Sequence, residues 1–165
     1  GDSAPDVVVY NAGIARDNMF VFMSPEEWDS VIHTNLDGFY HTVQPLLFGM
    51  IARRSGRIIV ITSASGQSGQ AGQVNYAASK AALAAAVKSL AREVGRKGIL
   101  VNAVSPGVIE TDMTAELPKE QILPMIPLKR FGTPEEVAGV ISFLCSPDST
   151  YLHGQVIAVN GGLLT

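Results

Sequence analysis

The run Arg57-Ile58-Ile59-Val60-Ile61-Thr62 indicates a β-strand, because it is rich in β-branched residues and apolar at nearly every position. A strand without polar alternation is usually covered on both faces, as in a parallel sheet. Downstream, residues 74–97 form an Ala-rich stretch that predicts a long helix, and Gly98 is placed to end it. A second apolar strand is expected over 99–104. The chain therefore contains a β-α-β unit at its centre.

The same alternation of strands and helices extends outward from this unit. Strands are expected at 7–10 and 155–160. Helices are expected from 24 to 53, with a bend near Gly38, and from 133 to 146, because both begin with a Ser or Thr cap, a Pro and a Glu three residues later. Residues 63–73 and 108–132 are expected to form loops, the second with short helical pieces. The order β-α-β-α-β-α-β predicts an α/β fold around a parallel sheet.

Composition excludes several classes of protein. The chain has 165 residues, of which 47% are hydrophobic and 16% charged, and its formal net charge is −3. This balance excludes disorder, and the low charge indicates surface that another subunit or another part covers. No basic block exceeds Arg53-Arg54, so we expect no nucleic-acid partner. We expect no membrane span and no signal peptide, because no apolar run reaches about 18 residues and the first six residues lack an apolar core.

The few thiol and imidazole groups predict neither disulfides nor metals. Cys145 is the single cysteine and lies in an apolar run, which indicates a buried, inert thiol. The three histidines have no ligand spacing with one another or with Cys145, so no metal site is expected.

Tyr76 and Lys80 are four residues apart near the start of the long helix, so their side chains share one face. A cation beside a phenol favours the phenolate and lowers its pKa from about 10, which suits proton exchange with an alcohol or a ketone. The spacing alone is more typical of a solvated helix face. However, Asn11-Ala12-Gly13, Ser63 and Ser105-Pro106-Gly107 each follow a predicted strand. The carboxyl ends of parallel strands meet at one edge, which is where open α/β sheets bind ligands.

These motifs together resemble the short-chain dehydrogenase/reductase family over essentially the whole chain. The matching residues are Asn11-Ala12-Gly13, Asn35 within His33-Thr34-Asn35-Leu36, Ser63, Tyr76-Ala77-Ala78-Ser79-Lys80, Pro106-Gly107-Val108-Ile109-Glu110-Thr111 and Asn160-Gly161-Gly162. The resemblance implies one domain over residues 1–165. That domain would be the catalytic, C-terminal part of a Rossmann-type, doubly wound parallel sheet in three α/β/α layers.

The resemblance also implies roles for individual residues. Tyr76 would be the general acid for ketone reduction, or the base for alcohol oxidation, and Ser63 would hydrogen-bond the substrate oxygen. Lys80 would hold the nicotinamide ribose and lower the pKa of Tyr76. Asn35 would hold a water that relays protons to Lys80; alternatively, it is a helix-kink residue that bonds the backbone. The cofactor would contact Asn11, Ala12, Gly13, Tyr76, Lys80, Pro106, Gly107, Ile109 and Thr111.

The loop over 110–127 would form a substrate lid. Its Met113, Leu117 and Met125 are expected either to contact substrate or simply to pack.

Three stretches are informative within the family: the pattern Asn-Ala-Gly-Ile-x-Arg-Asp-Asn over residues 11–18, Ser89-Leu90-Ala91-Arg92-Glu93-Val94, and Ile109-Glu110-Thr111-Asp112-Met113-Thr114. In these, the sequence resembles bacterial 3-oxoacyl-acyl-carrier-protein reductases most closely. This implies NADP(H), with NAD(H) possible, and an acyl-carrier-protein or acyl-CoA substrate. Arg54 and Lys97 match the basic residues that receive the carrier protein beside the site. A homotetramer or dimer in the cytoplasm, acting in fatty-acid synthesis, is expected. Other family members, acting on alcohols, sugars or steroids, share much of the motif set and remain an alternative.

One family feature is missing from the sequence. The Gly-rich turn that holds the cofactor pyrophosphate would follow an earlier strand, whereas Gly66–Gly72 precedes the catalytic Tyr. A first half of about 60 residues or more would precede Val7, so strand 7–10 would expose an apolar edge. The rival hypothesis is a catalytically dead oligomerisation module. It would use the small face of the long helix, formed by Ala78, Ala82, Ala85 and Ser89.

Overall fold

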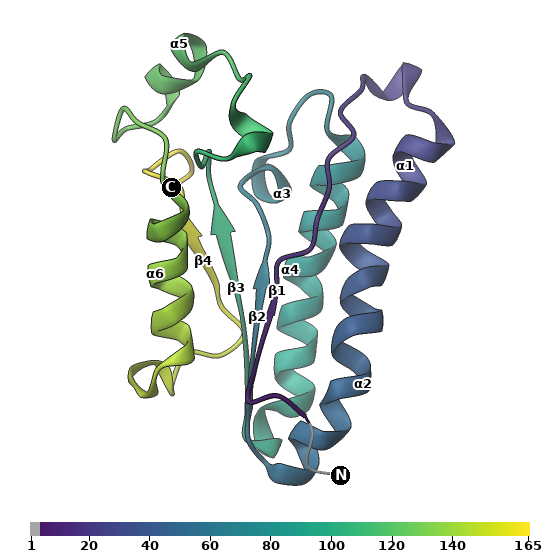
Figure 1. Ribbon diagram of the computed structural model, residues 1–165, viewed down its shortest axis with the longest axis vertical. Coiled ribbons are helices and arrows are strands. Elements are labelled where there is room, and N and C mark those ends of the chain that lie inside the picture. Colours follow the sequence, from purple (N-terminus) through teal and green to yellow (C-terminus); the bar gives the residue numbers. More distant parts are fainter. Residues whose placement is uncertain (1–3) are drawn as a thin grey trace.

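The computed structural model describes residues 4–165, and it confirms the α/β architecture. One four-stranded sheet runs in the order β1 (Val7–Tyr10), β2 (Gly56–Ile61), β3 (Ile99–Pro106) and β4 (Val156–Val159), as Figure 1 shows. Every neighbouring pair is parallel. All four strands therefore end at the same edge of the sheet, where the sequence places its candidate residues.

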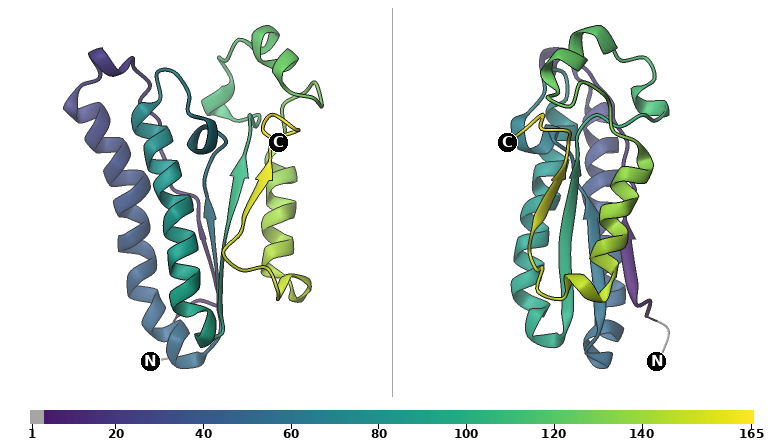
Figure 2. Two further views of the ribbon diagram at one scale, coloured as in Figure 1. Left: turned by 180° about the vertical axis from the view of Figure 1, so that it is seen from behind. Right: turned by 90° about the vertical axis from the view of Figure 1, so that its left-hand side faces the viewer.

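Helices cover both faces of the sheet and make three layers (Figure 2). One face carries α2 (Gly38–Arg53) and α4 (Val74–Val94), with α1 (Pro25–Ile32) packed against α4. The other face carries α6 (Pro134–Cys145). Two short helices, α3 (Ser65–Ser68) and α5 (Lys119–Ile122), lie in connections beyond the carboxyl edge.

The last crossover has the opposite hand to the first two. Each connection moves one strand further in the same direction, so the face that its helix covers sets the hand. Because α2 and α4 lie on one face and make the usual right-handed crossovers, the β3–α6–β4 connection on the other face is left-handed, which is rare. α6 packs against β3, β2 and β4, and its first turns line the same cavity as Val9 of β1.

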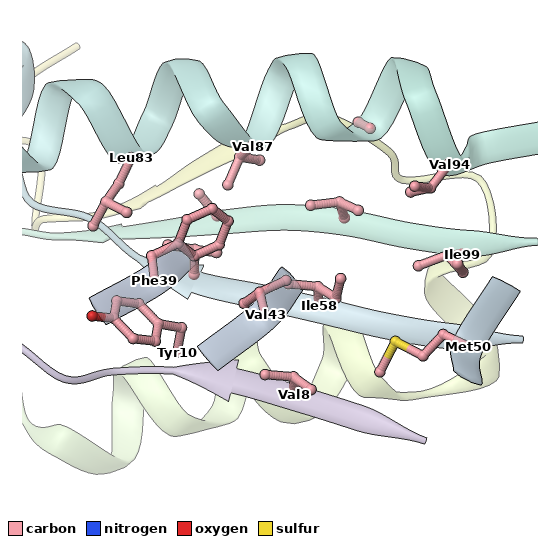
Figure 3. Packing of buried hydrophobic residues seen from close by; sticks show 14 residues of the cluster. Val8, Tyr10, Phe39, Val43, Met50, Ile58, Leu83, Val87, Val94 and Ile99 are labelled. Atoms are coloured by element: carbon pink, nitrogen blue, oxygen red, sulfur yellow. The ribbon is translucent and has the colours of Figure 1, made fainter. Parts of the chain in front are cut away.

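The two hydrophobic cores follow from the alternation of side chains along each strand. Ile58 and Val60 of β2 face α4 and α2, while Ile59 and Ile61 face α6. Figure 3 shows the larger core, in which α4 residues pack onto side chains from β1, β2, β3 and α2. Its labelled members are Val8, Tyr10, Phe39, Val43, Met50, Ile58, Leu83, Val87, Val94 and Ile99.

The predicted helix starts are confirmed. Ser24 and Glu27 form a capping box at α1, and Thr133 and Glu136 form another at α6. The bend expected near Gly38 is a π-helical turn, η2 (His33–Asp37), which separates α1 from α2. Such turns often mark functional sites, because the extra residue redirects the side chains around it. Here the turn contains Asn35.

Other details differ from the expectations. The short helix α3 lies within the predicted loop 63–73, and β3 continues to Pro106. The prediction of a buried Cys145 was wrong: it lies at the end of α6, packs against the smaller core and stays partly exposed. Within residues 4–165, β1 pairs only with β2, so its other edge is open as expected. Across the same residues, no helix combines the length and apolar character needed to cross a bilayer.

Candidate active site

A cavity of about 650 Å³ opens at the carboxyl edge of the sheet. It brings together nearly every residue that the sequence singled out, although they are far apart along the chain. The lining residues among them are Asn11, Gly13, Ser63, Tyr76, Lys80, Pro106, Gly107, Ile109 and Thr111. Ala12 does not line the cavity and is exposed, and Asn35 lies buried behind it.

Tyr76 enters the cavity from the first turn of α4. Burial raises the pKa of its phenol, and the negative charge of Asp17 acts in the same direction, while hydrogen bonding from Ser63 lowers it. The net direction contradicts the expectation that a neighbouring Lys lowers this pKa. Desolvation is the largest cause here, and the Lys80 ammonium lies 5.6 Å from the centre of the ring. Tyr76 is therefore a neutral phenol near pH 7, in the form that donates a proton.

Ser63 follows β2 and is held by its own turn. Its Oγ accepts a hydrogen bond from the main-chain N–H of Ser65 at 3.2 Å. A hydroxyl that accepts from the backbone keeps its own proton for donation. Ser63 and Tyr76 thus present two O–H donors to the same cavity, which is an arrangement that can polarise a carbonyl oxygen.

Lys80 is 3% exposed and lies one helical turn beyond Tyr76. Its Nζ donates to the main-chain oxygen of Ile61 at 2.9 Å. Desolvation lowers the pKa of Lys80 to about 8, because burial penalises the charged ammonium. Space beside this ammonium depends on Gly13, since a Cβ there would lie 3.2 Å from Nζ. The buried Lys80 ammonium therefore lies next to main chain at Gly13 that carries no side chain.

Asn35 uses both of its amide protons within the protein. Its Nδ2 donates to the main-chain oxygen of Ile14 at 3.1 Å and to Ser79 Oγ at 3.0 Å, while its Oδ1 accepts from the N–H of Ile14 at 2.8 Å. Ser79 in turn donates to the main-chain oxygen of Tyr76. Asn35 therefore ties the loop after β1 to α4, as the kink interpretation of this residue expects.

The cavity also has walls that the sequence did not reveal. Val9 and Thr62 contribute from strand ends. One wall comes from α6, through Pro134, Val137, Ala138 and Ile141. Nothing in the local sequence pattern marks α6 as part of the site, because its place here depends on the left-handed crossover. Only the three-dimensional topology reveals it.

The expected lid is only partly at the cavity. Met113 lines it, whereas Leu117 and Met125 do not. Thr111 and Thr114 close a tight turn, in which the N–H of Thr111 donates to Thr114 Oγ1 at 3.0 Å. Further along, Lys119 pairs with Glu110 and lies over the ring of Phe131, so short-range contacts hold this segment.

Arg54 and Lys97 do not flank this cavity, so that part of the expectation was wrong. Arg54 precedes β2 and Lys97 precedes β3, which places both at the amino edge of the sheet, opposite the cavity (Figure 1). Both are exposed, and Arg54 donates to the main-chain oxygen of Arg96. The error arose because a match of sequence positions says nothing about which edge of the sheet they occupy.

The structure also has a second, smaller cavity, and its described residues form no metal-binding cluster. A smaller cavity of about 220 Å³ lies between the end of β4 and the start of α6, where Arg130 and Glu136 form an ion pair. Among the described residues, no three His, Cys, Asp or Glu side chains gather closely enough to hold a metal ion.

Comparison with known proteins gives consistent matches over nearly the whole chain. The family model described as Enoyl-(Acyl carrier protein) reductase matches residues 3–164. The 3-oxoacyl-[acyl-carrier-protein] reductase of Aggregatibacter actinomycetemcomitans is 52% identical over 158 residues, which are 94% of this chain and 65% of that protein. The protein of the same name from Pseudomonas aeruginosa is 51% identical over 162 residues, covering 96% and 66%.

A relative with a different name matches almost as well. The acetoacetyl-CoA reductase of Synechocystis sp. is 46% identical over 158 residues, covering 93% of this chain and 66% of that protein. The chain thus spans slightly less than two thirds of the length of these curated relatives.

Proposed function

Because the chain belongs to the short-chain dehydrogenase/reductase family, we propose that the intact protein reduces the ketone of a 3-oxoacyl thioester to the 3-hydroxyacyl form with a nicotinamide cofactor. The observation that carries the proposal is the convergence of Ser63, Tyr76 and Lys80 on one cavity at the carboxyl edge of the sheet. Relatives named for 3-oxoacyl-carrier-protein and acetoacetyl-CoA reduction support this substrate class, since both names describe 3-oxo thioesters.

The residues present fit the nicotinamide–ribose part of such a cofactor. Lys80 has three N–H donors, and Ile61 takes one of them inside the protein, which leaves donors for a diol in the cavity. Gly13 keeps the main chain bare next to Nζ, so a ring can approach closely. We therefore assign cofactor contacts to Lys80 and Tyr76 with Asn11, Gly13, Pro106, Gly107, Ile109 and Thr111, all of which line the cavity. The contact proposed for Ala12, which lies outside the cavity lining, rests on the family resemblance alone. When bound, the cofactor supplies the hydride.

Tyr76 then provides the proton for the substrate oxygen. Its raised pKa keeps it protonated at neutral pH, so it donates as negative charge develops on the ketone oxygen. Ser63 donates a second hydrogen bond to the same oxygen and stabilises that charge. Lys80, one helical turn beyond Tyr76, fixes the position of the ribose relative to the phenol. We assign Asn35 a supporting role, because its amide protons are already committed to Ile14 and Ser79; a water relay beside it stays a prediction.

Several finer assignments rest on the resemblance and the relatives alone. NADPH is the preferred cofactor, NAD(H) is the alternative, and fatty-acid synthesis is the setting. The thioester carrier is an acyl-carrier protein or coenzyme A. A homotetramer or dimer and a cytoplasmic location are part of the same proposal. In the described chain, Ala78, Ala85 and Ser89 of α4 are exposed and Ala82 is partly so.

The decisive experiment is Tyr76→Phe in the intact protein, assayed with acetoacetyl-CoA and NADPH. Removing the phenolic proton should lower kcat by about 10²- to 10⁴-fold, because that is the usual contribution of a positioned general acid. Tyr151→Phe is the matched control, since Tyr151 is fully exposed and should keep wild-type kcat. Thermal melting should show both variants folded.

Two outcomes would overturn the proposal. If Tyr76→Phe retains wild-type kcat, Tyr76 is not the proton donor. If the intact wild-type protein binds neither NADPH nor NADH in a fluorescence titration and reduces the ketone with neither, the oligomerisation module is the better description. Crotonyl-CoA should be offered in parallel, because reduction of its C=C bond alone would assign the protein to enoyl reduction instead.

A further inference from the structure

The amide of Asn75 joins three separate segments at the start of α4. Its Oδ1 accepts from the main-chain N–H of Tyr76 at 2.7 Å. Its Nδ2 donates to the main-chain oxygen of Arg16 at 3.0 Å and to that of Glu27 at 3.1 Å. The side chain is fully buried, so each of these bonds replaces contact with water. One amide thus connects the helix that carries Tyr76, the loop after β1, and α1.

The segment that Asn75 holds is a wall of the candidate active site. Asn11 and Gly13 line the cavity, and the same loop continues through Arg16 to Asn18. Asn35 secures this loop at Ile14, and Asn75 secures it again at Arg16. Beyond Arg16, the N–H of Asn18 donates to the main-chain oxygen of Gly72 at 2.9 Å. The loop is therefore held at Ile14, Arg16 and Asn18. Of these three attachments, the one at Arg16 comes from Asn75, the residue that directly precedes Tyr76.

We propose that Asn75 is a positioning residue that fixes Tyr76 against the Asn11–Asn18 loop, and hence against the substrate and cofactor that the cavity receives. This inference rests on the function proposed above. Neither amide proton of Asn75 has an alternative partner in water, because the residue is completely enclosed. Loss of the amide frees the loop to move relative to Tyr76, which separates the proton donor from the opposite wall of the site. A shift of about 1 Å between reacting groups can lower a rate by roughly 100-fold.

Asn75→Ala and Asn75→Asp in the intact protein test the two halves of this argument. Alanine removes all three bonds. Aspartate keeps the volume and the acceptor for Tyr76 N–H, but it points a carboxylate oxygen at the carbonyl oxygens of Arg16 and Glu27. We expect kcat for acetoacetyl-CoA reduction to fall roughly 10- to 100-fold in both variants, with a much smaller change in KM. Asn75→Ser carries one hydroxyl donor in place of the amide, so its kcat should lie between the wild-type value and that of Asn75→Ala.

The matched control is Asn102→Ala. Asn102 is also a buried asparagine with its donor and acceptor both engaged, but its partners are Leu152 and Gln155 in the approach to β4. This variant should lose stability to a similar extent and yet keep kcat. A role in stability alone would make the two asparagine variants behave alike.

Amide hydrogen exchange without cofactor gives a readout that does not depend on activity. In the Asn75 variants, the Asn18 amide should lose protection, while the Ile14 amide, held by Asn35, should keep it. Wild-type kcat and unchanged Asn18 protection in Asn75→Ser or Asn75→Asp would overturn the inference. That result would leave the proposed function intact as long as Tyr76→Phe is inactive. An active Tyr76→Phe would refute the proposed function whatever Asn75 does.

Discussion

The same face of α4 is buried along the whole helix, but the buried side chains are polar at its start and apolar in the rest. In the first two turns this face presents Asn75, Ser79 and Lys80, all buried and polar. In the remaining turns it presents apolar side chains, namely Leu83, Val87, Ala91 and Val94. The polar part bonds to loops and strand ends around the cavity, while the apolar part packs on the sheet (Figure 3).

This difference separates stability from chemistry along a single helix. Burying apolar groups stabilises the fold in proportion to the area removed from water, whereas burying a polar or charged group costs free energy unless it is fully bonded. A protein keeps such groups buried where they serve a site. Substitutions in the apolar part should therefore affect mainly stability, whereas substitutions in the polar part change the bonding and desolvation of buried groups at the site and can affect both stability and activity.

Leu83→Ala tests the apolar half and should have the largest effect on stability. Leu83 is fully buried between α4 and the sheet, so its truncation leaves a cavity in the larger core. We expect the free energy of unfolding to fall by about 2–5 kcal/mol, as measured by urea denaturation. Below the unfolding transition, kcat should stay within about threefold of wild type, because Leu83 packs in the larger core and does not line the cavity. A threefold change corresponds to ~0.6 kcal/mol in the activation free energy. A large loss of kcat in the folded variant would remove the distinction between the two halves.

Lys80→Met tests the polar half and should move stability in the other direction. Burial lowers the Lys80 pKa to about 8, which corresponds to roughly 3 kcal/mol of destabilisation at neutral pH. Methionine has no charge to desolvate, although the bond to Ile61 is lost at a cost of about 1 kcal/mol. We therefore expect a net gain of about 2 kcal/mol at pH 7, together with loss of NADPH binding and of activity.

The pH dependence of that gain has a defined sign. The folded pKa of Lys80 lies below its unfolded value, so the unfolded chain binds more protons between pH 8 and about 10.5. Wild-type stability rises through this range because the buried ammonium is neutralised. The advantage of Lys80→Met should be complete below pH 8 and should shrink as pH rises. Urea denaturation of both proteins at pH 7 and pH 9.5 measures it, and an equal or larger gain at pH 9.5 would contradict the assignment.

Ser79→Ala should have the smallest effect of the three. It removes the acceptor for Asn35 and the donor to the Tyr76 carbonyl, and it leaves one buried N–H of Asn35 without its partner. We expect about 1–2 kcal/mol of lost stability by thermal melting. Ser89→Ala on the exposed face of the same helix is the control and should change stability by less than about 0.5 kcal/mol. Equal losses in both variants would show that the Asn35–Ser79 link contributes nothing.

Much of this arrangement could be predicted from the sequence. Apolar strands, two capping boxes and the Gly98 stop define the elements, and the carboxyl-edge rule for parallel sheets then brings Ser63, Tyr76 and Pro106 together. These predictions succeed because each signal either lies within a short stretch of sequence or follows from the parallel topology of the sheet. The Tyr76–Lys80 spacing belongs to the same class, since helix geometry alone puts both residues on one face.

What escaped prediction depends on contacts between distant segments. Asn75 stands beside Tyr76 in the sequence, but its importance lies in bonds to Arg16 and Glu27, which no local pattern shows. The raised pKa of Tyr76 is a sum of burial and charges over the whole site. The error over Arg54 and Lys97 has a different origin: each precedes a strand, so the parallel-sheet rule already places both at the amino edge, but the match with the family did not use strand direction.

The parallel order β1-β2-β3-β4 also has a consequence for how quickly the chain folds. Val7 pairs with Arg57, Gly56 with Ile99 and Ala103 with Val156, so strand partners lie 43 to 53 residues apart in sequence. No hairpin can nucleate such a sheet, and each pairing waits for a helix to form and dock between its strands. Folding should therefore be slow for a chain of this size. During that wait the apolar strands and the open edge of β1 are exposed to other chains, so refolding yield should fall as protein concentration rises.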